Sequence, residues 1–175
     1  MVHAWKEHSR EQLIDGYGRA IDRVYFELPN GVIKEFYLKR EGTPVVTLAL
    51  TANHEVILVK QFRPGPQRVM HELPGGGIDG EETPQEAVAR ELKEETGYQG
   101  NVEYVGVVYE CGYADKWRYC FVATACEEVA PQNFDQHEFI EREIVSLDTL
   151  RTYMRNGDLT DIDVAYLGLD YLGLL

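Results

Sequence analysis

Cysteine is scarce in the sequence, and its spacing suits neither a disulfide framework nor a metal finger. Cys111, Cys120 and Cys126 are odd in number and form no Cys-x-x-Cys pair. Small secreted domains rely on paired cysteines, and structural zinc sites rely on closely spaced ones. We therefore expect three structural thiols in a reducing compartment, with the cytoplasm as the location.

Long hydrophobic runs and an excess of positive charge are also missing. No unbroken apolar stretch approaches the ~18 residues that span a bilayer, and the N-terminal MVHAWKEHSREQL has no apolar signal core. Lys and Arg number 17 against 30 Asp and Glu, which gives a formal net charge of −13. We expect no membrane partner and no nucleic-acid partner, so an anionic ligand must be met by local cations.

The remaining composition is that of an ordinary folded protein. Of the 175 residues, 44% are hydrophobic and 27% are charged. A chain of this length can bury a substantial core in one main domain with modest appendages.

Strand-like segments surround one clear helix. Residues 24–38 read VYFELPNGVIKEFYL, and Asn30-Gly31 is a strong signal for an antiparallel hairpin. Further β-branched and aromatic runs predict strands at residues 44–50, 55–62, 102–109, 118–125 and 144–145.

The central helix has start and stop signals of its own. Thr83, Pro84 and Glu86 form a capping-box pattern with proline in the first turn, and Gly97 ends the segment. Residues 147–172 again show helical apolar spacing. Strands on both sides of one helix, with helix at the end, predict a mixed-sheet α/β sandwich.

Three carboxylates share one face of the central helix. Glu91, Glu94 and Glu95 stand at i, i+3 and i+4, where like charges repel. Arg90 can reach Glu86 and Glu94 four residues away in each direction, but one guanidinium cannot neutralise the cluster. Dense oxygen ligands fit Mg²⁺ or Mn²⁺, whereas a solvated charged face is the structural alternative.

The glycines before this helix favour the metal-site reading. Gly75-Gly76-Gly77 lets bare backbone approach a metal or a phosphate closely. The spacing Gly76-x5-Glu82-x7-Arg90-Glu91-Leu92-x-Glu94-Glu95-x-Gly97 resembles the signature of the Nudix hydrolases. Tyr98 replaces the aliphatic residue that usually ends the signature, at a position we interpret as packing.

The resemblance extends to one branch of that family. The segments GTPVVTLAL, VILVKQFRPG and HELPGGGID are similar to those of enzymes that hydrolyse ADP-ribose and other nucleoside diphosphate sugars. It implies an α/β fold, a Nudix α/β/α sandwich with a mixed sheet and an N-terminal antiparallel β-hairpin. It further implies that residues 1–42 form an N-terminal hairpin region that dimerises, and that residues 43–175 form the Nudix hydrolase domain of a homodimer.

The resemblance also implies a set of metal ligands. The carbonyl of Gly75 and the carboxylates of Glu91, Glu95 and Glu138 would bind two to three Mg²⁺ or Mn²⁺ ions. Glu94, Glu95 and Glu138 are the candidate catalytic residues, Glu94 as an assistant and Glu138 as a ligand or base on a loop. Some relatives carry a second glutamate where this chain has Gln136, so the resemblance does not identify the general base. Without the resemblance, Glu138 would be interpreted as an ordinary surface acid.

Substrate contacts are implied at three positions. Arg63 resembles the arginine that grips a substrate phosphate, Glu72 matches a pocket glutamate, and Gly76 approaches the substrate; a surface ion pair and a structural acid are the alternatives for the first two. Glu82 and Arg90 would orient the loop and the helix. Aromatic candidates for stacking on a base or ribose, each equally explained by packing, are Trp5, Tyr25, Tyr113 and Trp117.

The predicted reaction is metal-dependent hydrolysis of the diphosphate in a nucleoside diphosphate sugar, with ADP-ribose giving AMP and ribose 5-phosphate. Residues 110–115 lack the proline that ADP-ribose-selective relatives carry, which leaves a broader sugar preference open. The alternatives are a Nudix enzyme acting on nucleoside triphosphates or dinucleoside polyphosphates, a diphosphate isomerase on the same fold, and a non-catalytic nucleotide-sensing module.

Overall fold

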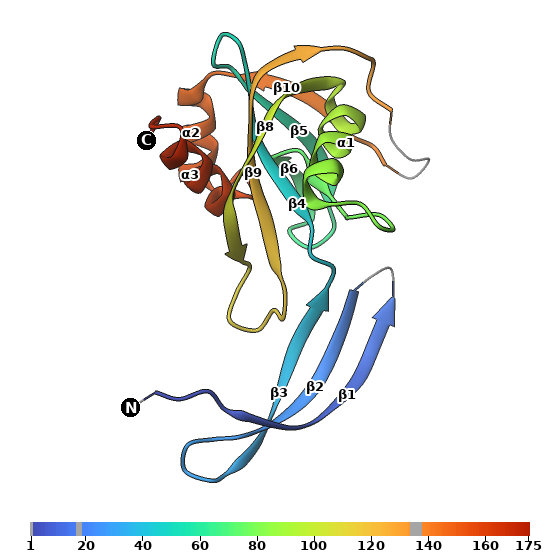
Figure 1. Cartoon of the computed structure of the whole chain (residues 1–175), viewed down its shortest axis with the longest axis vertical. Helices are drawn as coiled ribbons and strands as arrows, with labels where there is room; N and C mark the ends of the chain where they lie inside the picture. Colours follow the sequence, from blue (N-terminus) through green and yellow to red (C-terminus); the bar gives the residue numbers. More distant parts are fainter. Residues whose placement is uncertain (1, 17–18, 134–137) are drawn as a thin grey trace. The chain divides into compact units, whose positions relative to one another are not determined.

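The computed structural model describes residues 2–16, 19–133 and 138–175. The chain divides into two compact units, which are described in turn (Figure 1). One contains Met1–Thr43 with Tyr109–Trp117, and the other contains Pro44–Val108 with Arg118–Leu175.

The first unit is a three-stranded antiparallel sheet. Its strands, in the order β1-β2-β3, are Lys6–Gly16, Arg19–Glu27 and Ile33–Glu41. The predicted hairpin is confirmed as β2 and β3, and Gly31 takes a left-handed φ of 79° in the turn. Strand β1 was not predicted, because every one of its residues is exposed and no apolar alternation marks it.

The second unit contains a mixed sheet in the order β10-β5-β4-β9-β8, with β6 beside β5 and β7 beside β4. Strand β4 pairs with β9 in parallel and with β5 antiparallel. The bounds are β4 Val45–Thr51, β5 Val56–Arg63, β6 Arg68–Glu72, β7 Gly75–Gly76, β8 Tyr98–Tyr109, β9 Trp117–Glu128 and β10 Glu141–Val145.

Helices cover both faces of this sheet (Figure 1). Helix α1, Pro84–Thr96, lies on one face, and α2, Leu147–Asn156, and α3, Ile162–Tyr171, lie on the other. Alternation along β4 explains the layers, since Leu48 packs in the core with α2 and α3 while Val45 packs with α1. The predicted α/β/α sandwich with a mixed sheet and an N-terminal hairpin is confirmed.

The ends of α1 are fixed as the sequence predicts. The Thr83 side chain accepts a hydrogen bond from the Glu86 N–H, and Glu86 reaches back to the Thr83 N–H at 2.9 Å. Gly97 adopts φ 79° and donates its N–H to Lys93. Val88 and Leu92 form a core stripe that is buried against the sheet, and the acidic stripe faces the glycine turn.

Two of the three cysteines are buried, as expected of structural thiols. Burial raises the pKa of the Cys120 and Cys126 thiols to about 11, whereas Cys111 is exposed. Tyr98 is buried in the cluster that contains Leu92, so its departure from the usual residue type is a packing change. Among the described residues, no helix is long and apolar enough to cross a membrane.

Candidate active site

A glycine turn brings the backbone of β7 against the carboxylates of α1. Gly75 and Gly76 pair with β4, and the Thr47 N–H donates to the Pro74 carbonyl at 2.9 Å. A Cβ on Gly75 would collide with the Val45 carbonyl, and one on Gly76 would collide with the Glu91 carboxylate. Glycine at position 75 therefore allows the close approach to β4, and glycine at position 76 leaves the Glu91 carboxylate in its place.

Glu95 is a buried carboxylate at the centre of the site. Its side chain accepts the Gly75 N–H at 2.9 Å, and the residue is 7% exposed. Burial raises its pKa to about 8, and the charges of Glu91, Glu138 and Glu72 act in the same direction. The protein alone therefore does not fully compensate the negative charge of an ionised Glu95.

Glu91 and Glu94 are held together by one guanidinium. Arg90 Nη1 donates to Glu91 at 3.0 Å and to Glu94 at 2.9 Å. Burial still raises the pKa of Glu91 despite this contact. The expected Arg90–Glu94 contact is present, but the expected contact with Glu86 was wrong, because Glu86 is committed to the capping box.

The other side of Arg90 binds the loop before the helix. Its Nε donates to Glu82 at 2.9 Å, and its Nη2 donates to the Gly77 carbonyl at 3.0 Å. Glu82 also accepts the Asp79 N–H at 3.1 Å, and the Arg90 contacts lower the pKa of Glu82. The structure thus brings Glu82 and Arg90 together as a brace between loop and helix.

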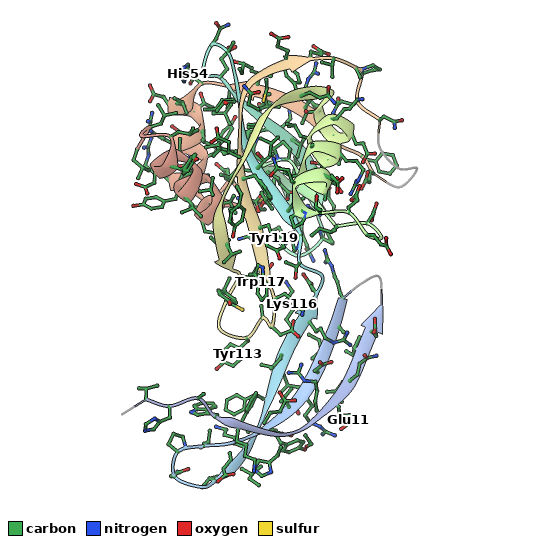
Figure 2. All side chains as sticks on the ribbon, in the orientation of Figure 1. Glu11, His54, Tyr113, Lys116, Trp117 and Tyr119 are labelled. Carbon is green, nitrogen blue, oxygen red and sulfur yellow. The ribbon has the colours of Figure 1, made fainter. Side chains whose placement is uncertain are left out.

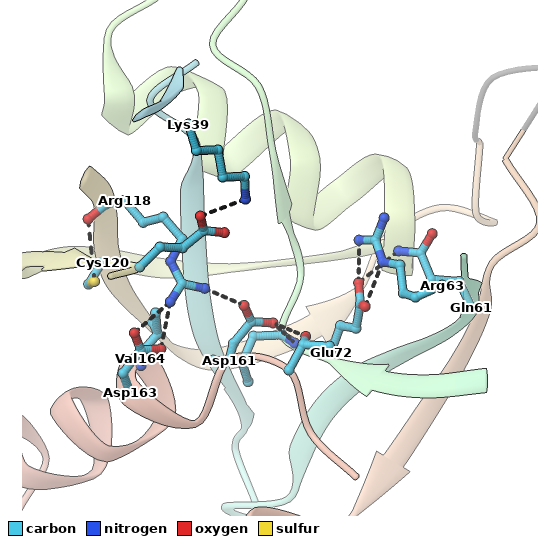
Figure 3. A network of polar contacts seen from close by, with 12 residues as sticks. Lys39, Gln61, Arg63, Glu72, Arg118, Cys120, Asp161, Asp163 and Val164 are labelled. Atoms are coloured by element: carbon cyan, nitrogen blue, oxygen red, sulfur yellow. Dashed lines mark hydrogen bonds and ion pairs between the residues drawn. The ribbon is translucent and has the colours of Figure 1, made fainter. Parts of the chain in front are cut away.

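Arg63 and Glu72 form a second charged pair on neighbouring strands (Figure 3). Arg63 Nε donates to Glu72 Oε1 at 2.6 Å, and Nη2 reaches the other carboxylate oxygen. Gln61 donates to the same carboxylate at 2.9 Å. Glu72 is 4% exposed while the Arg63 side chain is 40% exposed, so the guanidinium is the part that can meet a ligand.

Glu138 lies near the carboxylate helix on the segment before β10. It is exposed, and its charge raises the pKa of both Glu91 and Glu95. Gln136, the position of the second loop glutamate in some relatives, lies outside the described residues.

The donor chemistry of this site fits a divalent cation. Glu91 and Glu95 are carboxylates with raised pKa values beside the exposed edge of a glycine turn, which is the ligand type Mg²⁺ prefers. Within the described ranges, however, no three His, Cys, Asp or Glu side chains converge as a ready-made metal cage. In this structure, Arg90 and the Gly75 N–H hold carboxylate oxygens of Glu91, Glu94 and Glu95 by hydrogen bonds.

Sequence reasoning missed a third charged cluster in this unit (Figure 3). Arg118 at the start of β9 donates to Asp161 at 2.7 Å and to Asp163 at 2.7 Å. Asp161 is buried and also accepts the Leu73 N–H at 3.2 Å. A lone arginine in an otherwise apolar and aromatic strand was the available signal, but its partner lies 43 residues away.

The aromatic candidates for stacking all lie in the first unit. Trp5 packs on Phe36 with ring centroids 5.3 Å apart, and Trp117 meets Tyr109 edge to face at 6.2 Å. Tyr113 lies on the segment between β8 and β9 and is 58% exposed (Figure 2). Both tryptophans thus contact other aromatic rings of the same unit.

A sandwich whose glycine turn faces an acidic helix defines the Nudix type of hydrolase, and comparison with known proteins agrees. Residues 41–161 match the model of the NUDIX domain. ADP-ribose pyrophosphatase of Bacillus subtilis (strain 168) is 30% identical over 174 residues, which cover 97% of this chain and 92% of that protein. The chain belongs to the Nudix hydrolase family.

Two further likenesses are informative. Methanol dehydrogenase activator of Bacillus methanolicus is 28% identical over 166 residues, covering 91% of this chain and 90% of that protein. A crystal structure of an ADP compounds hydrolase superposes with a TM-score of 0.80 at 18% identity, covering 100% of this chain and 99% of the other. That structure shares the fold.

Proposed function

We propose that this Nudix hydrolase cleaves the diphosphate of nucleoside diphosphate sugars, with ADP-ribose as the best substrate. The observation that carries the proposal is the buried Glu95 beside Glu91, because a bound cation would compensate the charge of two carboxylates whose pKa values burial raises. The relatives named as ADP-ribose and ADP-sugar pyrophosphatases support the choice of substrate class. In the reaction, water oxygen bonds to one phosphorus as the bridging P–O bond breaks, giving AMP and ribose 5-phosphate.

Each residue of the site has a role in this proposal. Glu91, Glu95 and the carbonyl of Gly75 hold two to three Mg²⁺ or Mn²⁺ ions, with Glu138 as a further ligand or as the base. When bound, such ions neutralise the diphosphate and lower the pKa of the attacking water. Glu94 supports the cluster through Arg90, which donates to both Glu91 and Glu94.

Substrate binding falls to the second charged pair. Arg63 offers a forked guanidinium to a phosphate, and the buried Glu72 fixes its orientation through two hydrogen bonds. Gly76, without a side chain, leaves room for the diphosphate beside Glu91.

Assembly and location are part of the proposal. We assign residues 1–42 as a dimerising region and residues 43–175 as the hydrolase domain of a cytoplasmic homodimer. The sheet of the first unit supports this, since it exposes large apolar side chains that a partner would cover: Leu13, Ile14, Ile33 and Tyr37.

A substrate panel tests the proposed function. Purified protein with Mg²⁺ is assayed on ADP-ribose, ADP-glucose, GDP-mannose, ATP and diadenosine polyphosphate, with products separated by chromatography. We expect the highest kcat/KM on ADP-ribose and measurable turnover of the other diphosphate sugars. Preference for ATP or the dinucleotide would assign the chain to the other pyrophosphatase class, and no turnover at all would contradict an enzymatic role.

A further inference from the structure

The buried Asp161 occupies a helix-capping position but does not cap its helix. Asp161 is the N-cap residue of α3, with φ −101° and ψ 45°, and its side chain makes no capping hydrogen bond. An aspartate at this position ordinarily stabilises a helix by accepting a backbone N–H of its first turn. In its place, Asp163 accepts the Val164 N–H at 2.9 Å in the first turn.

The Asp161 carboxylate faces the glycine turn of the site instead. One oxygen accepts the Leu73 N–H at 3.2 Å and the Thr160 hydroxyl at 2.9 Å, and the other accepts Arg118 Nη1 at 2.7 Å. Figure 3 shows Asp161 between Arg118 and the segment that carries Glu72. The hydrogen bond between Leu73 and Asp161 joins residues 88 positions apart in the sequence.

The segment before Asp161 runs along the same turn. The His71 N–H donates to the Asp158 carbonyl at 3.0 Å, and the Thr160 N–H donates to the His71 carbonyl at 3.1 Å. The Leu73 N–H continues this series one step further, with a side-chain carboxylate as its acceptor. Asp161 is therefore the last contact of a clamp that follows β6 into the turn.

The clamped turn connects to both the Arg63–Glu72 pair and the carboxylates of α1. Glu72, directly before Leu73, orients Arg63, while Gly75 donates its N–H to Glu95 at 2.9 Å. A shift of the Leu73 peptide would move both groups together, and a misplacement of about 1 Å is enough to lower activity strongly.

From this geometry we propose that Asp161, braced by Arg118, is a positioning residue that fixes the Leu73–Gly76 turn for metal and substrate binding. It touches neither substrate nor metal. The inference rests on the proposed function, because it treats Glu91 and Glu95 as the metal ligands. Outer partners of this kind change metal affinity by about 10–100-fold when removed.

Three variants separate positioning from general stability. Asp161→Ala removes the acceptor, Asp161→Asn keeps a weaker neutral acceptor, and Asp163→Asn is the matched control on the same arginine. Mn²⁺ affinity is measured by electron paramagnetic resonance without substrate, followed by kcat and KM on ADP-ribose. Circular dichroism and the unfolding midpoint establish that each variant is folded.

We expect the Mn²⁺ dissociation constant to rise about tenfold in Asp161→Ala and about threefold in Asp161→Asn, with no change in Asp163→Asn. We also expect kcat to fall in parallel. If Asp161→Ala fails to fold, the comparison of Asp161→Asn with Asp163→Asn tests the inference. Of these two aspartates, Asp161 is the one that accepts the Leu73 N–H. Equal Mn²⁺ affinity in both asparagine variants would overturn the inference. Since the Mn²⁺ series needs no substrate, an inactive panel would contradict the proposed function while the affinities still decided the role of Asp161.

Discussion

At the scale of single residues, Gly76 lies directly against the Glu91 carboxylate. A Cβ at position 76 meets the Glu91 carboxylate, whereas a Cβ at Gly77 meets no atom within 4 Å. The two neighbouring glycines thus differ in what a methyl group would do, although both belong to the same turn.

We expect Gly76→Ala to lower kcat/KM by about tenfold or more, because displaced ligands lose the geometry that the reaction needs. Gly77→Ala serves as the control and should stay within about threefold of the parent, since most surface substitutions are mild. Steady-state kinetics on ADP-ribose measures both. Equal losses in the two variants would mean that the close approach to Glu91 has no special importance.

At the scale of elements, helix α1 depends on the capping box at Thr83. The Thr83 hydroxyl and backbone both bind Glu86, and Ser146 caps α2 by accepting the Thr149 N–H at 3.1 Å. Thr83→Ala should lower the free energy of unfolding by about 1 kcal/mol, and Ser146→Ala should cost a similar amount. Urea unfolding measures both, and an unchanged midpoint for Thr83→Ala would contradict the cap.

The elements also mark how far the sequence could predict this molecule. Helix α1 was predictable because its caps, core stripe and acidic stripe are local signals within residues 83–97. Strand β1 was not, because it is exposed along its whole length and depends on pairing with β2.

Some polar contacts of the site could be predicted from the sequence, and others could not. Glu82 and Arg90 fall within the Nudix signature, so their brace could be anticipated. The bond from Leu73 to Asp161 could not, since a hydrogen bond that closes across the fold leaves no periodic trace in either segment. Glu86 and Arg90 show a further limit, because their spacing allows a contact, but Glu86 binds Thr83 instead.

At the scale of the whole molecule, the buried acids couple stability to pH. Folded Glu95 keeps its proton up to about pH 8, whereas an unfolded glutamate loses it near ~4.3. Between these values the folded state binds more protons, so the free energy of unfolding falls as pH rises, by at most about 1.4 kcal/mol per pH unit.

Thermal unfolding of the metal-free protein from pH 5 to pH 8 measures this slope. We expect Mg²⁺ to flatten it, because a cation favours the ionised carboxylate, and Glu95→Gln to remove the part due to this residue. A metal-free protein that grew more stable as pH rose through this window would contradict the buried, protonated state of Glu95.

Assembly is the second property at this scale. Sedimentation velocity should give twice the 20.0 kDa mass of the chain, and Ile14→Lys on the exposed strand β1 should weaken the association. A monomer at all concentrations would contradict the dimerising role of residues 1–42.

The most direct test of the account compares ADP-ribose hydrolysis by the parent protein, Glu95→Gln and Glu81→Gln in the presence of Mg²⁺. Glu81 is an exposed glutamate ahead of the same helix and controls for the loss of one acid. We expect equal amounts of AMP and ribose 5-phosphate from the parent and from Glu81→Gln. Glu95→Gln should be slower by about 10²–10³, the scale of an essential transition-state contact, while remaining folded. A Glu95→Gln protein with nearly the parent rate would contradict the carboxylate helix as the centre of the reaction.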